Sequence, residues 1–536
     1  MNIFQALLCA IVTMFCYSDA SYFGTSMLQR PIISAPLVGL IFGQFEVGVI
    51  IGGTLELAWL GMMNIGATQP ASVEVGGVVA TAFTIASGGG TDLALVIGVP
   101  VALLASYIQS CISVFCSWFI HKADKYVEAG DIDGVNRIHL YTSFIKIGGL
   151  GIVTFVSLLI GAPAVQSVIN SIPENIMSGF GAINDLLPAV GFAMLLAVMN
   201  NKKYMPFFFI GFLVATYLQV NVMFVALLSC CVAVFLMFNE SKQQNTEFTD
   251  DFESDFSEED NLPAESKEHK RLLSKKDLLD VFFRSFCVEA SFNYERMQGL
   301  GYAFTMSNIN KKLYKNKEER SRALRRDTEM FNTAPWLCTL IFGIGCAMEE
   351  RRAQDPNFDE ESLSAVKVGM MGPIAGIGDS IYWGTLRVIA GSIGATMMVQ
   401  GNPLGILAFI LIFNVPHLII KYYLMFAGYN MGTSILEKAE KGGLIDKIMS
   451  ASTIVGLSVV GCMVATTVVV NTPLALTFGE SVYELQAIFD SILPNLLPLL
   501  ATLLMFYLMV KKNVKPVTLI FGVAIVAMIL RVVGII

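Results

Sequence analysis

The chain has 536 residues, of which 54% are hydrophobic and only 15% are charged, and its mean hydropathy is +0.64. An ordinary soluble protein carries about 25% charged residues, and several apolar runs here reach or approach the ~20 residues that cross a bilayer. These values exclude an ordinary soluble protein and predict an all-α polytopic membrane protein. The formal net charge of −8 gives no signal for nucleic-acid binding.

The first part of the chain alternates apolar runs with Gly- and Pro-rich breaks. Residues 52–70 combine glycines with the carboxylate of Glu56, the indole of Trp59 and the amides of Asn64 and Gln69. Glu56 and Trp59 are three residues apart and would be neighbours on a helix. A charge at membrane depth is costly and normally faces protein or a water-filled cavity, so this stretch is a candidate binding site.

Basic and acidic segments then divide the chain. Residues 121–137 contain Lys122, Lys125 and Arg137, which predict the cytoplasmic side. Residues 206–238 read as two short spans that break near residues 219–221. Residues 240–270 are dominated by Asp, Glu, Ser and Asn, and cannot bury enough apolar surface to offset their ordering entropy. We predict a disordered acidic cytoplasmic linker there, between membrane domains at 1–239 and 271–536.

The second domain opens with polar sequence. Residues 274–331 predict a cytoplasmic amphipathic helical region, in which Ser274 and Asp277 resemble a helix N-cap. Residues 311–326 are strongly basic, which fits either contact with anionic lipid headgroups or a solvated helical face. Further apolar segments follow to the end of the chain.

Residues 367–391 form the second candidate site, because polar side chains stand there among apolar segments. They include Asp379, Ser380, Trp383 and Arg387. Several glycines and a proline argue against one uniform helix. If the segment is helical near Asp379, Asp379 and Trp383 share one face. One interpretation is a sugar site, in which the carboxylate accepts hydrogen bonds from sugar hydroxyls and the indole covers the sugar ring. The other is a Gly-rich packing hinge with an Asp–Arg pair.

The chain therefore has two hydrophobic halves, each with one Gly-broken acidic stretch. Secondary transporters are often built from paired repeats with the site at their interface. The pattern suggests re-entrant or broken helices related as inverted repeats. It predicts that Glu56 and Asp379 face a common pocket.

Catalytic and metal motifs are absent from the sequence. It has no His-Glu-x-x-His pattern, nucleophile elbow, P-loop or Cys-x-x-Cys pair. We therefore predict no metal, no cofactor, no catalytic residues and no ATP-driven pumping by this chain alone.

Several longer sequence motifs carry a family resemblance. Residues 52–57 (GGTLEL), 60–67 (LGMMNIGA), 121–125 (HKADK) and 204–212 (YMPFFFIGF) resemble the IIC membrane subunit of mannose-family sugar phosphotransferase systems. The second half is similar to the IID subunit of the same systems. Its matching motifs are residues 293–301 (NYERMQGLG), 331–335 (FNTAP), 347–350 (AMEE) and the stretch 369–387.

The resemblance implies a function. Such proteins lie in the bacterial cytoplasmic (inner) membrane, import a hexose or amino-sugar and release it inside as a phosphate ester. The phosphoryl group comes from phosphoenolpyruvate through general carriers and then histidines on separate IIA and IIB components. The IIC and IID subunits form the channel together in oligomers, for which the family suggests a trimer. Here both subunits lie on one chain, which raises their effective concentration for each other, and no IIA- or IIB-like domain is present.

The expected sugar site combines both halves. Glu56, Asn64 and Gln69 would bind hydroxyls from the first half, and Asp379 and Ser380 from the second, while Trp383 would stack on the ring. Mannose, fructose, sorbose and amino-sugars all fit such a site. Two alternatives stay open: an ion-coupled secondary transporter that uses Glu56 and Asp379 without phosphorylation, and a non-transporting sugar receptor.

Overall fold

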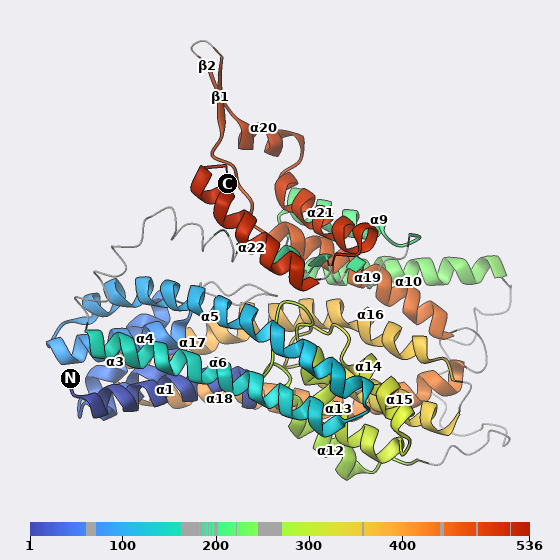
Figure 1. The fold of residues 1–536 in the computed structure, drawn as a ribbon, viewed down its shortest axis with the longest axis horizontal. Helices are drawn as coiled ribbons and strands as arrows, with labels where there is room; N and C mark the ends of the chain where they lie inside the picture. The colour runs from blue at the N-terminus through green and yellow to red at the C-terminus, as the bar shows by residue number, and fades with distance from the viewer. Residues whose placement is uncertain are drawn as a thin grey trace.

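The chain folds into long packed helices and one small two-stranded hairpin, as shown by a computed structural model (Figure 1). Most of the predicted acidic linker, residues 245–270, lies outside the described residues. The structure describes residues 1–59, 71–161, 182, 185–186, 188–190, 192–193, 196–197, 202–220, 222–244, 271–355, 358–439, 444–478, 481–514 and 516–535.

The helices of the first half begin and end where local sequence dictates. A capping box between Asn2 and Gln5 opens the first helix, and Pro31 stands in the first turn of the second. The predicted break near residues 219–221 is confirmed, because one helix ends at Leu218 and the next begins at Val222. The elements are α1 (Ile3–Tyr22), α2 (Pro31–Ile41), α3 (Phe45–Ala58), α4 (Val73–Ser87), α5 (Thr91–Glu128), α6 (Ile132–Ile160), α9 (Pro206–Leu218) and α10 (Val222–Gln244).

The second half opens with the capping box predicted at Ser274 and Asp277, which the structure confirms. Its elements are α12 (Lys275–Arg284), η1 (Ser285–Cys287), α13 (Gly299–Leu313), α14 (Lys317–Asp327), α15 (Thr339–Gln354), α16 (Glu360–Gly378), η2 (Asp379–Leu386), α17 (Arg387–Val399), α18 (Leu404–Ala439), α19 (Leu444–Thr467), β1 (Ala475–Phe478), β2 (Ser481–Glu484), α20 (Leu485–Ile492), α21 (Leu496–Lys512) and α22 (Pro516–Val533). The antiparallel pair β1–β2 projects from the helical body (Figure 1).

Several helices are long and apolar enough to cross a membrane. Among the described residues these are Ile3–Tyr22, Thr91–Glu128, Ile132–Ile160 and Leu404–Gly432. Helices α20 and α21 are bent by 79° at a short break and make a fifth span if they act as one. The predicted multi-pass helical protein with broken helices is thereby confirmed.

The helices pack as two bodies, each of which contains elements from both halves of the sequence (Figure 1). We call them the cavity body, made of α1–α6, α12–α15, α17 and α18, and the flanking body, made of α9, α10, α19, α21 and α22. In the cavity body α3 packs on α17 and α6 on α13, and in the flanking body α9 packs on α19. Helix α16 lies at the seam and contacts α15, α10 and α19.

Glycine permits the close contact between α9 and α19. A Cβ atom on Gly211 would lie only 1.9 Å from the backbone oxygen of Ser458, and one on Gly461 only 2.0 Å from that of Phe208. Small residues at such crossings let helix backbones approach closely in membrane proteins. Elements of the two sequence halves are therefore interleaved in space.

The stretch expected to break stays helical but changes its winding. Helix α16 continues through Pro373, and residues Asp379–Leu386 then form the π-helix η2 before α17 begins at Arg387. Insertions of π-helix into α-helices frequently mark functional sites. The predicted departure from one uniform helix is confirmed, in the form of an extra-wide turn and not a gap.

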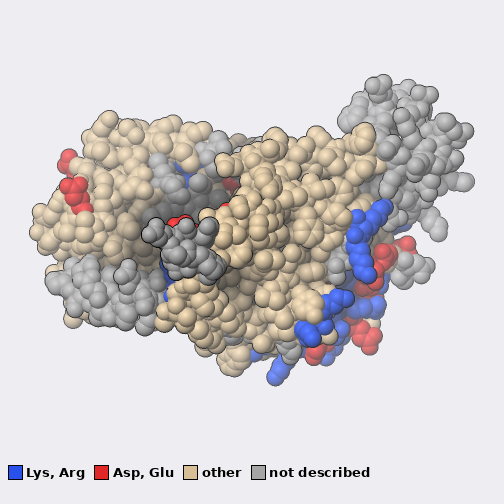
Figure 2. Space-filling model, turned by 90° about the horizontal axis from the view of Figure 1, so that it is seen from above, with Lys and Arg blue, Asp and Glu red and all other residues tan. Residues whose placement is uncertain are grey.

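Among the described residues, exposed charges gather at one end of the molecule. Figure 2 shows blue and red side chains concentrated at the end where Figure 1 places α12–α15. There the end of α5 and the start of α6 pack on the second half: Lys311 Nζ lies 2.5 Å from Asp133 Oδ1, and Arg296 Nη2 lies 2.8 Å from Asp124 Oδ1. The two basic segments that we predicted on the cytoplasmic side thus lie against each other.

Candidate functional site

A polar cavity of about 130 Å³ lies where the two sequence halves meet. A single water needs roughly 10–15 Å³ of such space, so the cavity can admit a small organic molecule. Its polar and aromatic lining residues are Tyr17, Ser21, Thr25, Gln29, Arg30, Glu74, Gln109, Lys146, Glu289, Phe292, Gln298, Asn332, Thr333, Trp336, Asp379 and Trp383.

The loop between α1 and α2 builds one wall. Its Thr25 has a φ of 60°, a left-handed conformation that is strained for a β-branched residue. The buried carboxylate of Asp19 holds the loop, because it accepts hydrogen bonds from Ser26 N (2.9 Å), Ser26 Oγ (2.6 Å) and Leu28 N (3.1 Å). The turn thereby presents Thr25, and the Gln29 and Arg30 that follow it, to the cavity.

Three further helices of the first half add single polar side chains. Glu74 lies in the first turn of α4 and is 4% exposed, and Gln109 comes from α5. Lys146 of α6 is buried and donates to the backbone oxygen of Phe292, which belongs to the second half. Each of these groups would be costly at membrane depth without the cavity or a partner.

A hydrogen-bonded pair of loops forms the adjoining part of the wall. Gln298 donates to the backbone oxygen of Thr333 (2.8 Å) and accepts from its N–H (3.0 Å), so the two loops are locked together. Glu289 accepts from Thr25 Oγ1 (2.8 Å) and from Gln298 Nε2 (3.2 Å). These bonds join residues of the first and second halves directly at the cavity.

The π-helix η2 supplies the remaining wall. Asp379 and Trp383, four residues apart, both line the cavity. The ring of Trp383 meets that of Trp336 edge-on, with centroids 5.7 Å apart and an angle of 79° between the planes. Two indoles at right angles make an apolar corner of the cavity wall.

The residues predicted from sequence fall into three groups. Asp379 and Trp383 line the cavity. Glu56 differs from the expectation of direct contact: it is 0% exposed, and its carboxylate is paired with Arg30, which does line the cavity. Asn64, Gln69 and the side chain of Ser380 lie outside the described residues.

Sequence reasoning missed most of the wall. Gln298, Asn332 and Thr333 lie within the motifs at residues 293–301 and 331–335. These motifs supported the family resemblance, but no site role was predicted for them. Arg30 and Glu74 are charges beside apolar runs, and the high cost of burying a charge was the signal that could have found them.

The cavity suits a small polyhydroxylated ligand. Carboxylates and carbonyl oxygens accept hydrogen bonds, amide and cationic groups donate them, and hydroxyls do both. The indoles offer apolar faces to a ring. Among the described residues there is no group of three or more His, Cys, Asp or Glu side chains that could hold a metal ion.

The membrane-spanning helices and the polar cavity between them define a multi-pass permease for a small polar solute. Comparison with known proteins places it more closely. Residues 272–536 match the model of the PTS mannose/fructose/sorbose family IID component, and residues 3–235 that of the PTS sorbose-specific IIC component. The chain belongs to the mannose/fructose/sorbose family of the phosphotransferase system (PTS) and combines IIC and IID sugar-permease components, which work with IIA and IIB.

Individual relatives agree with this assignment. The fructose permease IID component of Bacillus subtilis is 39% identical, over 48% of this chain and 96% of the relative. The mannose-specific EIID component of Escherichia coli K12 is 38% identical, over 47% and 91%. The fructose permease IIC component of B. subtilis is 31% identical, over 42% of this chain and 83% of the relative.

Proposed function

We propose that this chain imports a hexose or amino-sugar through the cavity between its halves, and that the sugar is released inside as a phosphate ester. The observation that carries the proposal is the cavity wall, where carboxylates, amides and hydroxyls from both halves surround two indole rings. Relatives named for fructose and for mannose are 39% and 38% identical. These two sugars are therefore the first to test.

Several residues have direct roles in this proposal. Asp379 accepts hydrogen bonds from sugar hydroxyls, with Ser380 beside it, and Trp383 covers an apolar face of the ring. Asn64 and Gln69 add polar contacts from the first half. The position of Asp379 and Trp383 on the cavity wall supports their part of the assignment.

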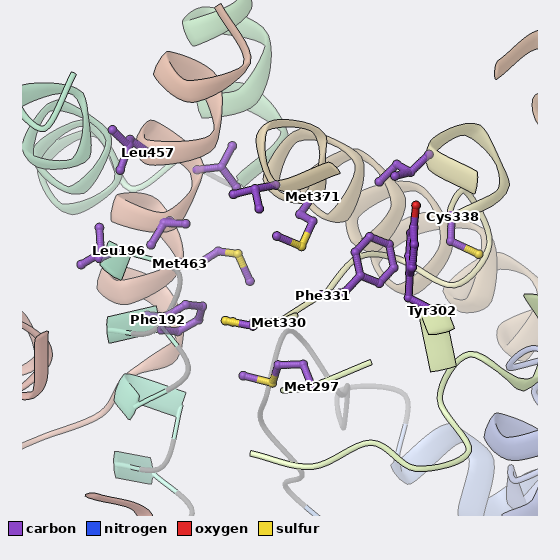
Figure 3. Close-up of a cluster of buried hydrophobic side chains, with 14 of the residues drawn as sticks. Phe192, Leu196, Met297, Tyr302, Met330, Phe331, Cys338, Met371, Leu457 and Met463 are labelled. Atoms are coloured by element: carbon purple, nitrogen blue, oxygen red, sulfur yellow. The ribbon is translucent and has the colours of Figure 1, made fainter. Parts of the chain in front are cut away.

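Transport requires that the cavity open alternately to the two sides. We assign this motion to the seam between the cavity body and the flanking body. Buried methionines face one another there (Figure 3). Met297 and Met330 come from the cavity body, Met371 from α16 and Met463 from α19, and all four are at most 6% exposed. Methionine is unbranched and adapts to changed surroundings, so this seam is suited to repacking as the bodies shift.

The phosphoryl donor, a phosphorylated IIB component, approaches from the charged end. Trp118 is 56% exposed and stands just before Lys122, and Tyr141 is 60% exposed and stands just after Arg137. Exposed aromatic residues next to basic ones are typical of a cytoplasmic membrane interface. From Trp118 to its end at Glu128, helix α5 extends about 15 Å at ~1.5 Å per residue. A headgroup layer is only roughly 5–8 Å thick, so the end of α5 projects beyond it.

Helix α14 packs on this extension of α5, at the turn that follows it. A Cβ on Gly130 in that turn would lie 2.5 Å from the backbone oxygen of Lys317. Lys315, Lys317 and Arg325 are exposed there. We assign this basic face to the docking of phosphorylated IIB, whose phosphoryl group is anionic. The cavity residue Asn332 follows five residues after α14 ends.

The proposal extends to the assembly. The two components share one chain, which sets their ratio at one to one and raises their effective concentration for each other. Pairs of components associate further into a trimer in the bacterial cytoplasmic (inner) membrane, and the membrane units are related as inverted repeats. Cross-linking in native membranes tests the trimer, and internal superposition of an experimental structure tests the repeats.

Uptake assays test the transport function itself. Cells that contain the IIA and IIB partners should accumulate labelled fructose or mannose phosphate, and cells that lack the general phosphotransferase carriers should not. Concentrative uptake of unmodified sugar without the carriers would establish an ion-coupled transporter instead. Sugar binding by the purified chain without any uptake would indicate a receptor.

A further inference from the structure

Four buried side chains of alternating charge run from the cavity wall into the contact between α3 and α17. They are Glu74, Arg30, Glu56 and Arg387, with exposures of 4%, 2%, 0% and 0%. Their formal charges sum to zero. Charges buried in a low-dielectric interior persist when they are paired and hydrogen-bonded. Only the first two, Glu74 and Arg30, line the cavity.

The guanidinium of Arg30 is held from two directions. Its Nε lies 2.9 Å from Glu56 Oε1 and 3.2 Å from Oε2, and its Nη2 lies 2.9 Å from Glu56 Oε1. The same Nη2 donates to the backbone oxygen of Trp59 at 2.9 Å. A planar donor fork bound by one carboxylate and one carbonyl has a fixed orientation. Arg30 also interacts electrostatically with Glu74.

A second buried arginine, from the other half of the chain, lies in the electrostatic field of this ion pair. Arg387 interacts electrostatically with both Glu56 and Arg30. A Cβ on Gly53 would lie 2.8 Å from the backbone oxygen of Ala395. The glycine thus lets α3 lie directly on α17, with Glu56 one turn further along α3.

Arg387 in turn supports a side chain on the cavity wall. It is the residue that follows η2, its guanidinium carbon lies 5.5 Å from the ring centroid of Trp383, and its Nε donates to the backbone oxygen of Trp383 at 3.4 Å. A cation over an indole face is attracted to it, more strongly when both are desolvated. The position of Trp383 therefore depends on where Arg387 is held.

We propose that Glu56 is a positioning residue that does not touch the sugar. It pairs with Arg30 and offsets the repulsion between Arg30 and Arg387, and so it fixes one cavity side chain in the first half and, through Arg387, the Trp383 indole in the second. The part of this inference that concerns sugar affinity rests on the proposed function, whereas the link from Glu56 to Trp383 does not.

Fluorine NMR of the full chain in lipid nanodiscs, labelled with 5-fluorotryptophan, tests the link without any sugar. The chain has four tryptophans, and Trp383→Phe identifies the signal of interest. Glu56→Gln is expected to shift the Trp383 signal, because loss of the Glu56 charge leaves the repulsion between Arg30 and Arg387 without compensation. Trp118, which is exposed in the C-terminal half of α5, should keep its signal.

Matched variants make the outcome decisive. Glu56→Asp keeps the charge and should return the Trp383 signal toward the wild-type position, whereas Glu46→Gln removes an exposed carboxylate from the same helix and should change nothing. An unmoved Trp383 signal in Glu56→Gln, or a shift that Glu56→Asp leaves as large, overturns the proposal.

Binding of fructose and mannose to the same samples gives the second readout. Glu56→Gln should weaken binding by about tenfold, with partial recovery in Glu56→Asp. Wild-type protein that binds neither sugar would count against the proposed substrates, and the NMR result would still decide the role of Glu56. Wild-type affinity in Glu56→Gln would overturn the positioning role.

Discussion

The indole Nε1 of Trp336 donates a hydrogen bond of 2.9 Å to the backbone oxygen of Thr25, across 311 residues of sequence. Trp336 is 0% exposed and its ring stacks on Tyr382, with centroids 5.0 Å apart. The acceptor belongs to a turn with a positive φ at Thr25 and at Met27. A side chain of the IID component thus stabilises a strained turn of the IIC component that forms part of the cavity wall.

Replacing Trp336 by Phe tests this connection. The change keeps an aromatic ring but leaves a buried backbone oxygen without its donor, which costs about 1–3 kcal/mol. We expect a lower melting temperature and weaker sugar binding, measured by thermal unfolding and equilibrium binding. Trp118→Phe, at a site that is 56% exposed, is the control. Equal behaviour of the two variants would show that the hydrogen bond has no role.

Asp19 should be as important for the same turn. In Asp19→Asn the amide can still accept from Ser26, but it places N–H groups where the carboxylate accepts from Leu28 N. The mismatch should cost roughly 1–3 kcal/mol and displace Thr25, Gln29 and Arg30. Sugar titration should reveal a loss of affinity. An unchanged affinity would mean that the turn is held by other contacts.

Asp379→Asn should abolish sugar uptake while expression and membrane insertion stay normal. The substitution keeps the shape of the side chain but removes a charged acceptor, whose hydrogen bonds are each worth about 1.5–3 kcal/mol. Labelled-sugar uptake and immunoblots measure the two quantities. Asp92→Asn, at an exposed carboxylate, should transport normally. Wild-type uptake by Asp379→Asn would remove Asp379 from the site.

The charged end should be sensitive to acid through Glu360. Partial burial alone would raise the pKa of Glu360, but hydrogen bonds from Arg352 and the charges of Arg326, Arg352 and Arg322 outweigh it and hold the pKa below the ordinary value of 4.5. A carboxyl whose pKa is lowered in the folded state stabilises the fold above its ordinary pKa, and that stabilisation disappears as the pH falls through the lowered value.

We therefore expect a stability loss on the order of 1 kcal/mol below pH 4.5 from this group, given its partial exposure. Melting temperatures measured from neutral pH down to about pH 3 detect it. The Glu360→Gln variant should be less stable at neutral pH and should show a shallower decline. Parallel curves for the two proteins would contradict the assignment.

Charge reversal at the start of α14 and in the residues just before it should separate docking from sugar binding. The double variant Lys315→Glu/Lys317→Glu should slow phosphorylation by IIB about tenfold or more and leave sugar affinity unchanged, because like charges then face the anionic donor. Higher salt should mimic the effect in the wild type. The matched control is Lys511→Glu/Lys512→Glu, at two exposed lysines at the end of α21.

Two other results are informative in that experiment. Equal phosphorylation rates in both double variants would exclude the α14 face as the docking site. Loss of binding to anionic vesicles by Lys315→Glu/Lys317→Glu, with normal phosphorylation, would assign the face to lipid headgroups.

The sequence by itself determined the membrane class, the two components and several local features. Apolar run length and charge content are properties of short segments, so they indicated spans without any tertiary contact. The capping box at Ser274, the break after Leu218 and the irregular winding at Asp379 were local for the same reason. The long sequence motifs identified the family.

Only the tertiary structure decided which side chains meet at the cavity. Arg30 and Asp379 lie on the same cavity although nearly 350 residues separate them, whereas Glu56, in a stretch singled out by its composition, lies behind Arg30. Helical side chains three or four residues apart share a face, but the direction of that face depends on how the helix is rotated against its neighbours. Packing between α3 and α17, and between the turn at Thr25 and Trp336, sets that rotation, and it is made by contacts between residues too distant in the sequence for any local pattern to record.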